Sequence, residues 1–178
     1  MIKHLTQSLR KFHRREDGST TVEFALLLPL FLMPLFSSVE LGIIALRQTM
    51  LERAMDITVR EIRLTTGDAP QHDEIRDRIC DRALFVSDCT SSLRLEMVQF
   101  DPFIWTDIDP IPDCVDSIEN VQPVREFVNG QSNELMYMRA CMKFTPIFPT
   151  WGLGSGLTKD DEGRASLFAS SVFVQEPS

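Results

Sequence analysis

A long run of hydrophobic residues dominates the N-terminal part of the chain. Between residues 24 and 46 the only charged side chain is Glu40. At about 1.5 Å per helical residue, a helix over this stretch reaches roughly 35 Å, which is enough to cross the hydrocarbon core of a bilayer. The pattern therefore predicts a membrane-spanning helix, which we assign to residues 19–46.

Two prolines, Pro29 and Pro34, fall inside this predicted membrane helix. Each removes one backbone donor and crowds the carbonyl four residues earlier, so a kink is expected at both positions. The kinks could let the helix bend while it packs into a fibre. Alternatively, they are ordinary membrane-helix prolines whose freed carbonyls are satisfied by neighbours. The sequence leaves both interpretations open.

Beyond residue 46 the hydrophobic positions continue at helical spacing, with charged residues between them. This pattern predicts an amphipathic extension of the same helix. The extension should end near Gly67, because glycine is a good helix stop. A single helix over residues 20–66 would then lie half in the membrane and half on a domain. The alternative is a membrane anchor followed by an independent helix.

The remaining residues predict one small domain. Its expected elements are a helix over 70–86 and strands over 91–100, 134–148 and 165–175. The glycine-rich stretch 151–156 is expected to be a flexible turn, and the proline-rich stretch 102–123 a loop. The predicted fold class is α+β, with the long N-terminal helix packed on a small antiparallel sheet. The predicted organisation is a basic leader (1–18), the membrane segment (19–46) and an external domain (47–178).

Charge is distributed unevenly along the chain. The formal net charge is −8, but residues 1–18 carry +3, so residues 19–178 carry −11. Since basic residues favour the cytoplasmic side of a membrane helix, the N-terminus is predicted to be cytoplasmic and the rest external. An acidic external domain also argues against nucleic-acid binding, which requires a basic surface.

All four cysteines lie beyond the apolar segment, at Cys80, Cys89, Cys114 and Cys141. This placement is typical of an oxidising compartment and predicts two disulfides. Four cysteines allow three connectivities; the pairs nearest in sequence, Cys80 with Cys89 and Cys114 with Cys141, are favoured. No CxxC spacing occurs, so a zinc site is a poor fit.

Residue types suited to catalysis are scarce. Only His72 lies beyond the N-terminal segment, and no G-x-S-x-G motif accompanies it. Acidic residues cluster in two places without the spacing of an EF-hand, so solvated loops are expected there. The two clusters are Asp107, Asp109 and Asp113, and residues 160–162. We therefore expect no enzyme activity, no metal and no cofactor.

The junction before the apolar run contains Gly18 followed by a polar stretch with a single carboxylate, Glu23. An acid at the edge of hydrocarbon costs a few kcal/mol unless a partner neutralises it. Cleavage after Gly18 would create an ammonium on Ser19, one helical turn from Glu23. The same ammonium could instead meet Glu23 of a neighbouring subunit and set the axial register of a polymer.

At these residues the chain resembles the type IV pilins, whose leader ends in Gly and whose mature segment carries Glu at its fifth position. Counted from Ser19, the fifth residue is Glu23 and the sixth is Phe24. The wider string over residues 18–31, followed by residues 39–42, resembles the TadE family of Tad (Flp) pilus pseudopilins. Weaker similarity extends to residues 140–146 and 174–177.

The resemblance implies a minor pilin or pseudopilin cut by an inner-membrane prepilin peptidase between Gly18 and Ser19. It implies that Glu23 and Phe24 act in subunit register. The implied partners are other pilin and pseudopilin subunits, the peptidase, the inner-membrane assembly platform and the lipid bilayer. The domain would be periplasmic, or extracellular once assembled in an adhesive pilus. The alternative is an uncleaved single-pass envelope protein with a periplasmic binding or scaffold domain.

Overall fold

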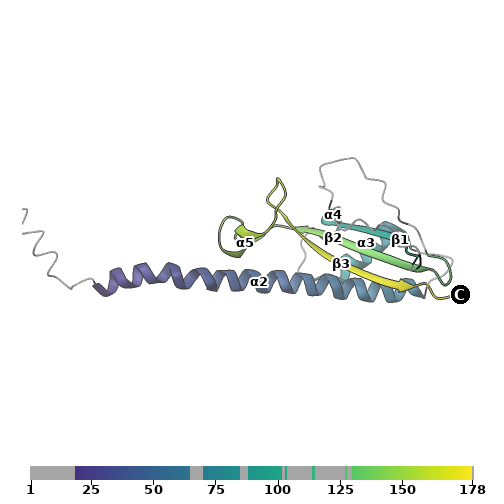
Figure 1. The fold of residues 1–178 in the computed structure, drawn as a ribbon, viewed down its shortest axis with the longest axis horizontal. Coiled ribbons are helices and arrows are strands. Elements are labelled where there is room, and N and C mark those ends of the chain that lie inside the picture. Colours follow the sequence, from purple (N-terminus) through teal and green to yellow (C-terminus); the bar gives the residue numbers. More distant parts are fainter. Residues whose placement is uncertain are drawn as a thin grey trace, which may run out of the picture. The chain divides into compact units, whose positions relative to one another are not determined.

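The structure of this protein is a computed structural model that describes residues 19–64, 70–84, 88–101, 103, 114, 127 and 130–177. The fold is α+β, as predicted, with helices and one three-stranded antiparallel sheet (Figure 1). The elements are α2 (Ser19–Arg63), α3 (His72–Arg82), α4 (Cys89–Ser92), β1 (Leu93–Gln99), β2 (Leu135–Phe144), α5 (Gly152–Gly156) and β3 (Ala165–Val174). The chain divides into two compact units between Val39 and Glu40.

The sheet has the strand order β1-β2-β3, and one of its faces supplies much of the core. In the register, Leu95 pairs with Ala140, and Ala140 pairs with Ala169 on the other side. Alternate residues of β1 and β3 are buried, as expected for strands covered on one face. The central strand β2 also buries Arg139 and Cys141 on its other face. The buried set includes Leu93, Leu95, Met97, Met136, Met138, Met142, Leu167 and Phe173. The predicted small antiparallel sheet is therefore confirmed.

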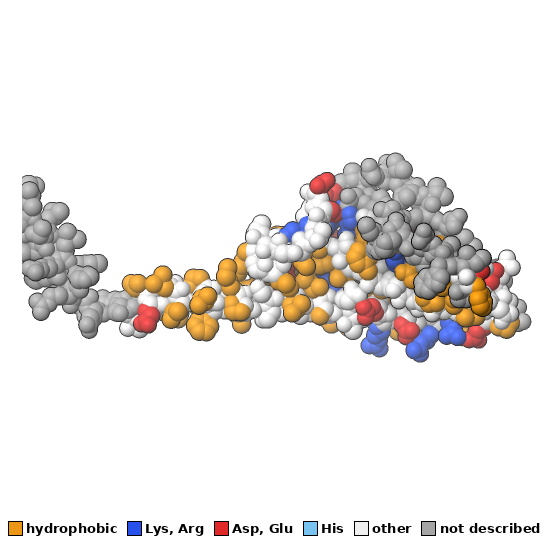
Figure 2. All heavy atoms as spheres, in the orientation of Figure 1, with side chains coloured by type: hydrophobic (Ala, Val, Ile, Leu, Met, Phe, Trp, Pro, Cys, Tyr) orange, Lys and Arg blue, Asp and Glu red, His pale blue; other side chains and the backbone are white. Residues whose placement is uncertain are grey.

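The C-terminal half of α2 packs into this core. Its buried positions follow helical spacing: Leu51, Ala54, Met55, Val59 and Ile62. The opposite side carries exposed charged residues, and Figure 2 shows blue and red side chains gathered along it. The predicted amphipathic extension of the first helix is thus present, and it is continuous with the apolar part. The described helix ends at Arg63, while the predicted stop at Gly67 lies outside the described residues.

Two polar contacts hold the end of α2 in the domain. The Gln175 amide donates to the Ile62 carbonyl at 3.0 Å, which ties the end of β3 to α2. From α3, the Arg82 guanidinium donates to Glu61 at 2.7 Å. Since these partners come from three separate elements, they fix where β3 and α3 lie along α2.

Helix α3 is shorter than the predicted range of 70–86. It begins at His72 after the extended Gln71, and its last hydrogen bond runs from the Ala83 amide to the Ile79 carbonyl at 2.9 Å. Its two fully buried residues, Ile75 and Ile79, belong to the face predicted from the sequence. Residues 85 and 86 lie outside the described residues.

The predicted strand over 91–100 begins two residues later than expected. Ser91 and Ser92 belong to the short helix α4, because both hydroxyls donate to the Asp88 carbonyl, at 2.9 and 2.8 Å. Serine hydroxyls compete in this way with strand hydrogen bonds. The strand predicted over 134–148 ends at Phe144, two residues before Pro146. The strand predicted over 165–175 ends one residue early, at Val174.

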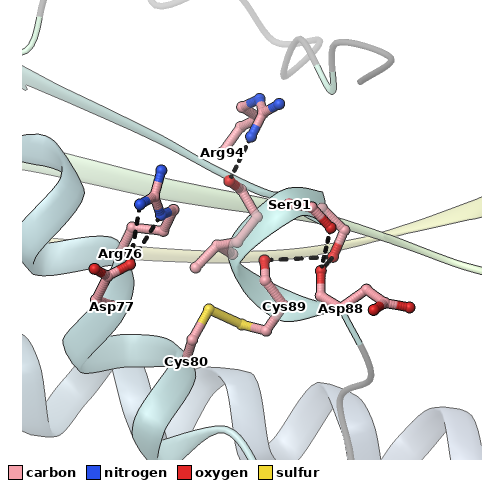
Figure 3. Close-up of a disulfide and its surroundings, with 9 residues drawn as sticks. Arg76, Asp77, Cys80, Asp88, Cys89, Ser91 and Arg94 are labelled. Atoms are coloured by element: carbon pink, nitrogen blue, oxygen red, sulfur yellow. Dashed lines mark hydrogen bonds and ion pairs between the residues drawn. A yellow bond between two sulfur atoms is a disulfide. The ribbon is translucent and has the colours of Figure 1, made fainter. Parts of the chain in front are cut away.

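Both cysteine pairs have the connectivity favoured by sequence spacing. Cys80 bonds Cys89 and thereby joins α3 to α4; Figure 3 shows this bond beside the pairing of Arg76 with Asp77. Cys114 bonds Cys141, which lies on β2. The two bridges close loops of the chain with sequence separations of 9 and 27 residues. Such cross-links stabilise a small fold by restricting its unfolded state.

Candidate functional site

The apolar first half of α2 has the features of a membrane-spanning segment. Helix Thr20–Arg63 contains a stretch long and apolar enough to cross a membrane, and it is the only such helix among the described residues. Its large hydrophobic side chains are exposed rather than packed (Figure 2). They are Val22, Phe24, Leu26, Leu27, Leu28, Leu30, Phe31, Met33, Leu35 and Val39. Exposed hydrophobic surface on this scale indicates contact with lipid or with other apolar helices.

The predicted processing and register residues lie at the start of this helix. Gly18 is outside the described residues, and Ser19 is the first residue of α2. Glu23 is exposed and has no hydrogen-bond or ion-pair partner among the described residues, and Phe24 is 62% exposed. The Glu23 carboxylate, at the start of an apolar helix and without a partner among the described residues, is therefore available to a partner from another subunit.

The helix continues without interruption through Pro29 and Pro34. The kinks expected at these positions therefore do not divide it into separate elements. In the turn after Pro34, the Ser38 hydroxyl donates to the Leu35 carbonyl at 2.7 Å.

Glu40 is the residue that links α2 to a distant loop. Its side chain is only 1% exposed, although it follows directly after the exposed apolar stretch. One carboxylate oxygen accepts the Phe148 amide at 3.2 Å, and the other accepts the Gly154 amide at 3.2 Å. A buried carboxylate is tolerated when backbone amides compensate its charge in this way. Glu40 thus fastens the loop before and within α5 to α2.

The stretch predicted as a flexible turn is the short helix α5. Gly154 is buried, and a Cβ there would collide with the Phe148 carbonyl oxygen and lie 3.0 Å from the Glu40 carboxylate. The Lys159 ammonium closes the loop by donating to the carbonyls of Pro149 and Gly154, at 2.7 and 2.6 Å. The stretch is thus a short helix rather than the predicted turn, because these tertiary contacts outweigh the low helix propensity of glycine.

Sequence reasoning missed the role of Glu40. Its partners are backbone amides more than 100 positions away, which leave no side-chain motif in the sequence. A usable signal was nevertheless present, because Glu40 is the lone charge in the run 24–46. The argument that a carboxylate in an apolar segment needs a partner, applied above to Glu23, holds equally for Glu40.

The other candidates have ordinary surroundings. His72 starts α3, where its ring lies against Phe127 with centroids 5.6 Å apart. Its hydrogen bond to Asp73, together with the Arg76 guanidinium, holds the pKa of the Asp73 carboxyl below its usual range. Asp160 accepts hydrogen bonds from Lys143 and Arg164. Asp107, Asp109 and Asp113 lie outside the described residues. Among the residues that the structure describes, no cluster of metal-ligating side chains occurs.

The described residues define an α+β domain whose first helix begins as an exposed apolar segment of membrane length. A protein-family model described as TadE-like protein matches residues 18–60. Over this segment the chain is similar to TadE-like proteins, which confirms the resemblance read from its sequence. No curated protein and no solved structure matches the chain.

Proposed function

We propose that this protein is a minor pilin or pseudopilin that takes part in assembly of a Tad (Flp) pilus. The observation that carries the proposal is the position of the TadE-like match relative to the apolar helix. The match begins at residue 18, and the exposed apolar segment of α2 follows within about one turn, from Val22 on. A peptidase cut after Gly18 would release a subunit that starts with its assembly helix.

The geometry of α2 supports a role in lateral packing. Its first half offers exposed hydrophobic side chains on all sides, while its second half is held by the domain. In a bilayer this half contacts lipid, and in a fibre it would contact the equivalent helices of other subunits. The charge asymmetry around the helix supports a domain on the external side of the inner membrane. These features fit a single-pass membrane protein that can later enter a polymer.

The proposal is tested by complementation of a strain that lacks this chain. Pili should be lost or strongly reduced in that strain, and the wild-type chain should restore them. A Gly18→Val variant, whose leader would no longer be removed, should not. The matched control is Gly156→Ala, which lies outside α2 and whose added Cβ meets nothing within 4 Å; it should restore pili fully. Full piliation with Gly18→Val would favour the uncleaved envelope protein instead.

A further inference from the structure

The stretch 145–158, which includes α5, contains no charged residue, although Lys143 and Lys159 flank it. Ile147 is 49% exposed on it. Phe148 and Trp151 are partly exposed, and their rings meet edge to face with centroids 5.2 Å apart. Tryptophan is enriched where its ring can sit among lipid headgroups. We propose that the stretch 145–158 rests on the membrane surface on the domain side, with Trp151 as its anchor.

The contacts of Glu40 set the level of this stretch along α2. Phe148 and Gly154 both donate to Glu40, so the stretch lies at that position of the helix. Between Glu23 and Arg47 the only charged residue is Glu40, and Leu41 just beyond it is still exposed. A hydrocarbon core of about 30 Å corresponds to about 20 helical residues, so a core that begins after Glu23 ends within one turn beyond Glu40. The stretch bound to Glu40 then lies at the headgroup level.

Two charged side chains that contact this stretch, Glu40 and Lys159, are bound to its backbone. The Glu40 carboxylate is buried against two backbone amides, and the Lys159 ammonium is held by two backbone carbonyls. The stretch 145–158 itself presents only uncharged residues. Such a surface avoids the cost of bringing a charge to the edge of hydrocarbon. In contrast, the exposed side of α2 further along carries Glu52, Arg53, Asp56 and Arg60.

The inference requires that α2 is inserted in a membrane, but it does not require assembly into a pilus. The test therefore uses the full chain alone, reconstituted in vesicles of phosphatidylcholine and phosphatidylglycerol. Insertion is checked first by resistance to alkaline extraction. The membrane-surface proposal can therefore be tested even on a protein that inserts but forms no pili. Failure of this proposal is thus distinguishable from failure of the proposed pilus function.

The experiment measures quenching of tryptophan fluorescence by lipids brominated near the carbonyl end of their acyl chains. The Trp105→Phe variant leaves Trp151 as the only tryptophan. Its emission should be blue-shifted and largely lost in the brominated vesicles. Since Trp105→Phe could disturb folding, the wild-type chain is compared with Trp151→Phe in parallel. The quenched part of the wild-type emission should disappear in Trp151→Phe.

The matched control places the only tryptophan at Val174, by combining Val174→Trp with Trp105→Phe and Trp151→Phe. Val174 is 45% exposed and precedes Gln175, which bonds the Ile62 carbonyl. That position is 22 helical residues beyond Glu40, or roughly 33 Å from the membrane surface. The control should show no quenching. Equal quenching at Trp151 and at this control position would overturn the proposal, as would an unquenched Trp151.

Discussion

Replacement of Glu23 by Ala is expected to abolish or strongly reduce pilus assembly while leaving the domain folded. The carboxylate is exposed at the start of the apolar helix, without a partner among the described residues. After cleavage, the Ser19 ammonium of the same or a neighbouring subunit would neutralise it. Each loss of about 1.4 kcal/mol in a subunit contact lowers its association constant about tenfold. In a polymer that repeats the contact, a loss of this size prevents growth.

This prediction is measured by counting pili in electron micrographs and by the amount of the protein in sheared pilus fractions. The matched control is Glu52→Ala, which removes an exposed carboxylate from the same helix, within the domain. It should leave piliation unchanged. Normal piliation with Glu23→Ala would rule out the register role of Glu23.

Replacement of Glu40 by Ala is expected to release the loop that contains α5. The change removes the acceptor of two amides in a site that is nearly closed to water. Each buried amide that loses its charged acceptor costs about 1–3 kcal/mol, so the two together should lower the local stability by about 2–6 kcal/mol. Amide hydrogen exchange over residues 145–158 should accelerate accordingly, while exchange in β2 should change little.

A glycine pair provides an independent check of the same geometry. Gly154→Ala places a methyl group against the Phe148 carbonyl and the Glu40 carboxylate, whereas Gly156→Ala meets nothing within 4 Å. The first substitution should accelerate exchange over residues 145–158 as Glu40→Ala does. The second should not. If both alanine variants behaved like the wild type, the close approach of α5 to Glu40 would be contradicted.

The elements predicted best from the sequence are those with strong hydrophobic periodicity. The long helix was visible as an apolar run followed by an amphipathic extension, and the strands as alternation around Leu95, Met138 and Leu167. Disulfide pairing by nearest neighbours matches the structure. These features depend on the hydrophobic effect and on short chain closures, both of which leave local patterns.

The features that the sequence did not predict depend on contacts between distant segments. Helix α5 forms in a glycine-rich stretch because Glu40 and Lys159 bind its backbone, and a backbone partner has no residue signature. Helix α4 replaces the start of a predicted strand because two serine hydroxyls bind the Asp88 carbonyl. The second compact unit begins at Glu40, the residue that binds the loop of α5.

The measurement that tests the central proposal most directly is the N-terminal sequence and intact mass of the protein from its native membrane. It is made in cells with the prepilin peptidase and in cells without it. We predict a protein that starts at Ser19 when the peptidase is present, and one that retains residues 1–18 when it is absent. Recovery of residues 1–18 on the protein in cells with an active peptidase would contradict processing as a pilin. The uncleaved envelope protein would then be the better description.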